Sequence, residues 1–148
     1  MSEIDPPFHY HLLRKRTMAT LELTKDNFES TINDNDTVVV DLWAEWCGPC
    51  RVFGPTFDEA SDRHADIVFG KVNTESQAEL AGFLNVRSIP TVMVFRENVV
   101  LYSEPGALAP DAFDNLISQI KAVDMEDVHR RIAEHKNGAG KGHDGHDH

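Results

Sequence analysis

The strongest signals in this sequence lie in residues 38–50, which read VVVDLWAEWCGPC. The first six residues form a nearly continuous apolar run, the pattern of a strand that is buried on both faces of a sheet. Two cysteines, Cys47 and Cys50, follow where we expect a helix to begin, and Pro49 is early enough in that helix to be tolerated. The segment therefore predicts a buried strand, a short loop and a helix, with a cysteine pair at the junction.

Strands and helices alternate on both sides of this segment. The further elements predicted by apolar periodicity are strands at 19–23, 67–72, 90–95 and 99–103, and helices from Thr24, from Thr74 to about Leu84 and from Pro110. Thr74 and Gln77 have capping-box spacing, and Glu97-Asn98 predicts a hairpin turn because Asn tolerates a positive φ. Parallel neighbours need helical crossovers, whereas a hairpin is antiparallel. The predicted fold class is therefore α/β, with a central mixed β-sheet of about five strands flanked by about four helices.

One domain accounts for most of the 148 residues, and the chain extends beyond it at both ends. A chain of this length can form one well-buried domain but not two of ordinary size. We expect a flexible extension at 1–17, the folded domain at 18–123, a helical extension at 124–136 and a disordered tail at 137–148. The tail is rich in His, Asp and Gly. Because the regular pattern begins near Met18, both Met1 and Met18 are candidate start residues.

The overall composition argues against several functional classes. Hydrophobic residues make up 41% and charged residues 26% of the chain, as in an ordinary globular protein. The net charge of −11 argues against nucleic acid and anionic membrane surfaces as partners, because both require clustered Lys and Arg. No apolar run is long enough to span a membrane, and no secretory signal follows the basic residues 14–16. We expect a cytoplasmic protein, in a compartment where structural disulfides are rare.

The spacing of the two cysteines points to redox chemistry. A Cys-x-x-Cys pair at a strand-to-helix junction can close a small disulfide ring and reopen it by exchange. Cys47 is expected at the N-terminal end of the helix, where unpaired N–H groups and the helix dipole stabilise a thiolate, the attacking form. Cys50, one turn further on, is expected to resolve the mixed disulfide. The alternatives are a structural zinc site, for which only half of the usual four ligands is present, and a pair of inert thiols.

The segment WAEWCGPC, residues 43–50, resembles the active-site signature of the thioredoxin family. The resemblance extends over about residues 19–123 and includes unlinked positions in the same register. These matching positions are the buried acid Asp41, its partner lysine Lys71, the helix-kinking proline Pro55, the active-site cis-proline Pro90 in SIPT (88–91), and the substrate-groove glycine Gly106. The resemblance implies the thioredoxin fold and catalysis by Cys47 and Cys50.

Asp41 and Lys71 are the residues that the resemblance implies for proton transfer. Inside an apolar strand, Asp41 is either a general base for the Cys50 thiol or a structural acid satisfied by its neighbours. The strand pattern alone does not separate these roles, and the resemblance favours the general base. It also implies that Lys71 pairs with Asp41, although a lysine exposed at a strand end would give the same pattern.

Residues around the cysteines are implied to bind the client and to shape the loop. The implied substrate-binding residues are Trp46, Ile89, Pro90 and Gly106, and the active-site loop contains Trp43, Gly48 and Pro49. A cis Ile89–Pro90 bond would place the Ile89 backbone so that a client segment can pair with it as an added strand. We expect Trp46 to remain partly exposed as an apolar landing surface and Trp43 to pack beneath the loop. In the family, Gly-Pro between the cysteines is typical of reductants.

Together these features predict a protein disulfide reductase. The resemblance implies that a thioredoxin reductase regenerates the dithiol, that the clients are proteins with disulfides, and that no metal or other cofactor is needed; we also expect a monomer. Pro105 lacks the N–H found at the equivalent family position, which leaves the client range open. Two alternative functions are a redox-insensitive binding module with this fold, and an oxidase or isomerase, which conflicts with the absent signal sequence and with Pro49. The tail residues His143, His146 and His148, with Asp144 and Asp147, either bind a metal transiently or form a solvated tail without a role.

Overall fold

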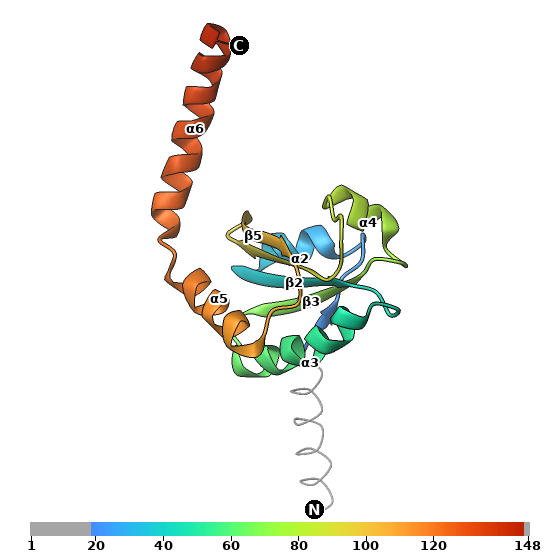
Figure 1. The fold of residues 1–148 in the computed structure, drawn as a ribbon. Helices are drawn as coiled ribbons and strands as arrows, with labels where there is room; N and C mark the ends of the chain where they lie inside the picture. The colour runs from blue at the N-terminus through green and yellow to red at the C-terminus, as the bar shows by residue number, and fades with distance from the viewer. Residues whose placement is uncertain (1–18, 147–148) are drawn as a thin grey trace, which may run out of the picture.

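A computed structural model of the chain describes residues 19–146, with side chains described for residues 19–137. The predicted extension at 1–17 and the candidate start Met18 lie outside these residues. The elements, in chain order, are β1 (Leu21–Glu22), α2 (Phe28–Asp34), β2 (Thr37–Trp43), α3 (Gly48–Arg63), β3 (Val68–Asn73), α4 (Ala78–Phe83), β4 (Thr91–Arg96), β5 (Val99–Pro105), α5 (Pro110–Ala122) and α6 (Met125–His146). Figure 1 shows the sheet with helices above and below it.

The five strands form one mixed sheet in the order β1-β3-β2-β4-β5. The central strand β2 runs parallel to β3 and antiparallel to β4, and β5 is antiparallel to β4. The parallel connection from β2 to β3 passes through α3, whereas β4 and β5 form the predicted hairpin. The predicted α/β fold with a mixed five-stranded sheet is confirmed.

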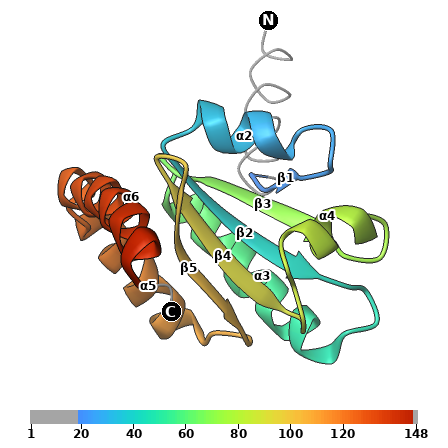
Figure 2. The same cartoon turned by 90° about the horizontal axis from the view of Figure 1, so that it is seen from above.

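Each face of the sheet has its own hydrophobic core, because successive residues of a strand point to opposite faces. Val38, Val40 and Leu42 of β2 pack in the core that also holds residues of α2 and α4, the helices that lie in front of the sheet in Figure 2. Val39 packs in the other core, which lies between the sheet and the helices α3 and α5. This second core holds four buried phenylalanines with ring centroids 5.2 to 6.4 Å apart, namely Phe53, Phe57, Phe69 and Phe113.

The hairpin turn between β4 and β5 has the backbone that its residues predict. Glu97 and Asn98 have φ angles of 52° and 69°, as a two-residue type I′ turn requires. The Glu97 N–H donates to the Asp36 carbonyl at 2.7 Å, and Asn98 Nδ2 donates to Asn33 Oδ1 at 2.8 Å. The turn is thereby fixed to the end of α2 and to the residue that precedes β2.

The start of α4 differs from the predicted capping box. The helix begins at Ala78, and its N-cap residue, Gln77, makes no side-chain capping hydrogen bond. The Thr74 hydroxyl donates instead to the Trp43 carbonyl at 3.0 Å, and the Thr74 N–H donates to the same oxygen at 2.8 Å. Since β2 and β3 end side by side, the carbonyl at the end of β2 takes the hydrogen bonds of Thr74.

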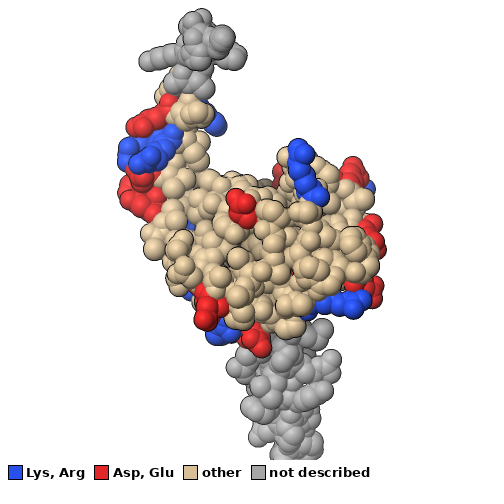
Figure 3. All heavy atoms as spheres, viewed as in Figure 1, with Lys and Arg blue, Asp and Glu red and all other residues tan. Residues whose placement is uncertain are grey.

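The last helix, α6, lies outside the sheet and its covering helices. Met125 is buried, and His129 Nε2 lies 2.8 Å from Glu97 Oε1 at the hairpin turn. Beyond this contact α6 projects from the sheet (Figure 1), and side chains of both charges gather on it (Figure 3). The sequence predicts a disordered tail from residue 137, whereas helical backbone continues to His146. A helix that is already nucleated adds further residues without a new nucleation cost.

None of the helices in residues 19–146 combines the length and the apolar character needed to cross a membrane.

Candidate active site

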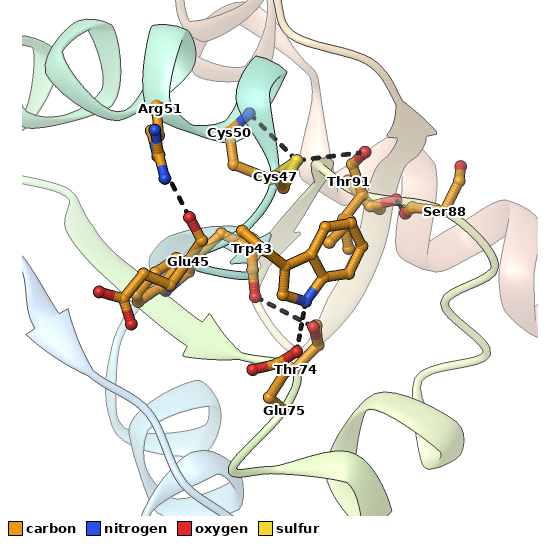
Figure 4. Close-up of a disulfide and its surroundings, with 11 residues drawn as sticks. Trp43, Glu45, Cys47, Cys50, Arg51, Thr74, Glu75, Ser88 and Thr91 are labelled. Atoms are coloured by element: carbon orange, nitrogen blue, oxygen red, sulfur yellow. Dashed lines mark hydrogen bonds between the residues drawn. A yellow bond between two sulfur atoms is a disulfide. The ribbon is translucent and has the colours of Figure 1, made fainter.

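Cys47 and Cys50 form a disulfide at the start of α3, with their Cα atoms 5.2 Å apart. Cys47 is the N-cap residue of this helix, with an extended backbone, and its Sγ accepts a hydrogen bond from the Cys50 N–H at 3.2 Å (Figure 4). An N–H group directed at sulfur from a helix N-terminus stabilises negative charge on that sulfur. This geometry favours Cys47 as the thiolate of the pair.

A groove beside Cys47 gives access to the disulfide. Each cysteine exposes only 4% of its surface, so a client disulfide must approach through an opening next to the sulfur atoms. The groove has a volume of about 530 Å³ and is lined by Trp46, Cys47, Gly48, Pro49, Thr74, Ala81, Val86, Arg87, Ser88 and Ile89. Trp46 and Ile89, two of the predicted substrate-binding residues, are therefore brought together.

The loop before β4 lies against the disulfide. The Ile89–Pro90 bond is cis, as the resemblance implies, and the Ile89 carbonyl oxygen lies 3.8 Å from Cys47 Sγ. The Thr91 hydroxyl donates to the Ser88 carbonyl at 2.6 Å and closes this loop. The Gly106 N–H donates to the Pro90 carbonyl at 2.8 Å, and its φ of 116° suits glycine alone. Gly106 is thus beside Pro90, although it does not line the groove.

The two tryptophans of the segment have different environments. Trp43 is half-buried and packs against the cluster of Ala44, Cys47 and Cys50, as predicted. Trp46 is 65% exposed, which confirms its predicted exposure, and its indole Nε1 donates to the Glu75 carboxylate. Glu75, which follows β3, therefore restrains the position of the exposed indole.

Asp41 is buried behind Cys50. It is 2% exposed, and the two residues line a common hollow of about 200 Å³ together with Trp43, Ala44, Glu45, Arg51, Gly54 and Lys71. Burial raises the pKa of Asp41 to about 7, because an ionised carboxylate is poorly solvated there; Lys71 opposes this increase and Asp58 adds to it. A carboxyl group with this pKa can both accept and release a proton at neutral pH.

Lys71 pairs with a different acid from the one predicted. Its Nζ lies 2.9 Å from Asp58 Oδ1 on α3, and no ion pair joins it to Asp41 in the part of the chain with described side chains. The Asp58 side chain is 46% exposed, although its paired Oδ1 atom is buried, so the Asp58 carboxylate keeps more of its hydration than the buried Asp41. The structure therefore contains no direct ion pair between Lys71 and Asp41 among the described side chains, but Lys71 still lowers the pKa of Asp41, so its expected effect on the charge of Asp41 remains.

Two residues of the site were not found from the sequence, Asp58 and Glu75. Asp58 follows Cys50 by eight residues with Gly54 midway, a spacing that places all three on one face of α3. That spacing could have identified Asp58 as a neighbour of the strand acid. Glu75 lies in an exposed turn where acidic residues are common, and it has no comparable signal.

Within residues 19–137, no three His, Cys, Asp or Glu side chains converge as a metal site. The side chains of the tail histidines, to which the hypothesis of metal binding by the tail refers, lie outside the described part of the chain.

Known proteins are similar to this chain in sequence and in fold. The family model "Thioredoxin" matches residues 19–122. A Streptomyces coelicolor protein named "Putative thioredoxin 2" is 48% identical over 122 residues, which cover 82% of this chain and 91% of that protein. The thioredoxin of Plasmodium falciparum has a solved structure with a TM-score of 0.64 and 33% identity, covering 68% of this chain and 98% of its own. Mitochondrial thioredoxin 3 from Saccharomyces cerevisiae has a TM-score of 0.64 and 26% identity, covering 70% and 98%. The chain therefore belongs to the thioredoxin family, and it is a protein-disulfide oxidoreductase that acts by dithiol–disulfide exchange at Cys47 and Cys50.

Proposed function

We propose that this protein is a cytoplasmic, general disulfide reductase in which Cys47 attacks client disulfides, Cys50 resolves the mixed disulfide and Asp41 exchanges the proton of Cys50. A thioredoxin reductase then restores the dithiol. The observation that carries the proposal is the position of Cys47 Sγ at the N-cap of α3, where the Cys50 N–H is directed at it from 3.2 Å.

The first step is attack by the Cys47 thiolate on one sulfur of a client disulfide. A bond forms between Cys47 Sγ and that sulfur, the client S–S bond breaks, and the second client sulfur leaves as a thiolate. The hydrogen bond from the Cys50 N–H and the N-terminal end of α3 stabilise the attacking thiolate before this step. The product is a mixed disulfide between Cys47 and the client.

The second step is resolution by Cys50. The Cys50 thiol gives its proton to Asp41 across the hollow that both residues line, and the resulting thiolate attacks Cys47 Sγ. The mixed disulfide breaks, the client leaves as a thiolate, and the Cys47–Cys50 disulfide forms. Two electrons have passed to the client, and NADPH supplies two electrons through the reductase to restore both thiols.

Client proteins are proposed to dock in the groove beside Cys47. Trp46 offers an exposed apolar ring at one side, and the Ile89 backbone lies next to Cys47 Sγ at the other. An extended client segment that pairs with the Ile89 backbone would bring its disulfide to the attacking sulfur. The hydrogen bond from the Gly106 N–H to the Pro90 carbonyl would support that backbone.

The direction of electron flow and the cellular setting belong to the same proposal. A histidine before Cys50 would stabilise the reduced form and make the pair more oxidising, and Pro49 cannot act in this way. Gly48 and Pro49 therefore favour a reductant. We propose that the protein works as a monomer, without a metal or nucleic acid and away from membranes, in a compartment that keeps thiols reduced.

The test is NADPH consumption with a thioredoxin reductase from the same source and insulin as the client. We expect rapid turnover by the wild-type protein and none by Cys47→Ser. The matched variant Cys50→Ser should also stop turnover, but it should accumulate a mixed disulfide with the client that reducing agent releases. Trapping by Cys50→Ser and not by Cys47→Ser would establish the order of attack.

Two results would contradict this function. Absence of insulin reduction by the wild-type protein, when dithiothreitol still reduces its disulfide, would argue against a general reductase. Full biological activity of Cys47→Ser would favour the redox-insensitive binding module instead.

A further inference from the structure

Three ionisable side chains meet where β2, β3 and α3 pack together. Asp41 and Lys71 are opposite each other in the parallel β2–β3 register. They lie on the sheet face that α3 covers, since each follows by two residues a member of that core, Val39 and Phe69. Asp58 reaches the same place from α3.

The ammonium group of Lys71 contacts side chains of α3 and not the Asp41 carboxylate of the neighbouring strand β2. Lys71 Nζ lies 2.9 Å from Asp58 Oδ1 and 5.9 Å from the ring centroid of Phe57, also on α3. Asp41 Oδ1 and Asp58 Oδ1 are both buried without a hydrogen-bond partner among the described residues, but only Asp58 Oδ1 lies within ion-pair distance of Lys71 Nζ. Lys71 thus leaves its register neighbour without an ion pair.

Asp41 is also faced by groups from the active-site loop, from α3 and from β4. The hollow that contains Asp41 is also lined by Cys50, Glu45 and Arg51, and the Arg51 Nε donates to the Glu45 carbonyl at 3.2 Å (Figure 4). On β4 the residue opposite Asp41 is the apolar Val92, and α5 contributes apolar side chains to this core. Lys71 and Asp58 are the charged groups that act most strongly on Asp41.

We propose that Asp58 is a positioning residue for thiol–disulfide exchange: its carboxylate holds the Lys71 ammonium on the α3 side, and this leaves the Asp41 carboxyl group unpaired and free to exchange a proton with Cys50. The inference rests on the function proposed above for Asp41.

The physical basis is a competition between two carboxylates for one ammonium group. Without the Asp58 charge, the carboxylate directly opposite Lys71 in the β2–β3 register is Asp41, and an ammonium within ion-pair distance favours the ionised form of an acid. Asp41 would then hold its charge and accept a proton from Cys50 less readily. The effects on the Asp41 pKa agree in direction with this competition, because Lys71 lowers that pKa and Asp58 raises it.

The experiment is a carboxyl-carbon NMR titration of Asp41 in the oxidised full-length protein, with the Asp41→Asn spectrum to assign the resonance. In Asp58→Asn we expect the Asp41 pKa to fall by about one unit, the low end of the effect of a close opposite charge. Asp58→Glu retains a carboxylate that can hold Lys71 and should keep the wild-type value. Asp114→Asn, which removes a partly exposed carboxylate 2.6 Å from Arg63 on α3, is the matched control and should also leave it unchanged.

The Lys71→Met background separates positioning from the direct effect of the Asp58 charge. If Asp58 acts through Lys71, Asp58→Asn should shift the Asp41 pKa much less in Lys71→Met than in the wild type. Equal shifts in both backgrounds, or no shift in the wild type, would overturn the inference. Thermal unfolding of each variant confirms that the compared proteins are folded.

A kinetic readout connects the pKa to the reaction. In Asp58→Asn the pH profile of the resolving step should move to lower pH, and its maximal rate should fall by about threefold, because a less basic Asp41 accepts the Cys50 proton less readily. The titration itself needs neither client nor reductase. Failure of the wild type to reduce insulin therefore removes the proposed function alone, whereas an unchanged Asp41 pKa in Asp58→Asn removes this inference alone.

Discussion

The two faces of β2 have the same backbone and the same depth of burial, but they carry different side chains. On the face toward α2 and α4, Val38, Val40 and Leu42 are all apolar and fully buried. On the face toward α3 and α5, Val39 is followed by Asp41, which is 2% exposed. A buried carboxylate without a partner is unfavourable, so only the second face gives up stability at this point.

The position of α3 explains why the unfavourable residue lies on this face. Cys50 is in the first turn of α3, and the hollow behind it opens toward Asp41. An acid on the opposite face of β2 would be separated from Cys50 by the sheet. One face of the central strand is therefore specialised for packing, and the other combines packing with proton exchange.

The largest expected effect comes from placing an acid on the packing face. Leu42→Asp would bury an unpaired carboxylate and also remove a buried leucine, with a combined cost of more than about 5 kcal/mol. A natural domain has only about 5–15 kcal/mol of stability, so we expect this variant to be largely unfolded at pH 7. Circular dichroism and urea unfolding would measure the effect.

The control for this substitution is Leu42→Met, which conserves volume and should cost less than about 1.5 kcal/mol. A folded Leu42→Asp protein with near-native stability would show that both faces of β2 accept a buried acid. The proposed difference between the two faces would then be contradicted.

The second effect in size is the pH dependence of stability caused by Asp41. The folded protein keeps a proton on Asp41 up to about pH 7, whereas the unfolded chain releases it near 3.8. Between these values the folded state binds more protons, so the free energy of unfolding falls as pH rises and becomes constant above about pH 7. The total fall from this residue is about 4 kcal/mol, at 1.36 kcal/mol per pKa unit.

Asp41→Asn should remove this contribution. Guanidinium unfolding at pH 4, 6 and 8 should show a flatter profile for the variant and a higher stability than the wild type at pH 8. At the same time, resolution of the mixed disulfide should slow by about 100-fold, the lower end of general acid–base contributions. Parallel pH profiles in both proteins would show that Asp41 does not hold its proton in the folded state.

A smaller effect is expected from trimming the packing face without changing its character. Ile32 of α2 is buried in the core that contains Val38 and Leu42. A buried Ile→Val substitution typically lowers the free energy of unfolding by about 1 kcal/mol, and we expect this loss for Ile32→Val. The loss should be the same at pH 4 and pH 8, because no titrating group is involved. Insulin turnover should stay at the wild-type rate; a changed pH optimum would indicate that the two faces are coupled.

Much of the fold was predictable because its signals are local. The apolar run at 38–43, the Glu97-Asn98 turn and the helical period after Pro110 each determine one element from neighbouring residues. The start of α4 was mispredicted because Thr74 has the spacing of a helix cap, while its actual partner is the Trp43 carbonyl on another strand. Local spacing carries no information about an acceptor thirty-one residues away.

The site was predictable to the same extent. Cys47, Cys50 and Asp41 lie within one short segment, and the structure brings them together as expected. The partner of Lys71 was assigned incorrectly, because the choice between Asp41 and Asp58 depends on how α3 packs on the sheet and on the relative hydration of the two acids. Sequence spacing identifies both candidates but does not rank them.

The smallest expected effect concerns the rim of the groove, where Glu75 accepts a hydrogen bond from the Trp46 indole. Both side chains are exposed, so water weakens this interaction and the net gain is at the low end of about 0.5–1.5 kcal/mol. Glu75→Gln keeps an acceptor but removes the charge, and we expect the KM for insulin to rise by about threefold with kcat unchanged, because the indole is less restrained before docking. The matched control is Glu79→Gln, which removes another exposed carboxylate, one that lies 3.5 Å from Lys25. If both variants raise KM equally, the effect is general loss of negative charge, and the Trp46–Glu75 contact does not contribute to docking. If Glu75→Gln alone raises the KM and also changes the tryptophan fluorescence, the Trp46–Glu75 contact contributes to client docking. The functional surface around the disulfide then extends to Glu75.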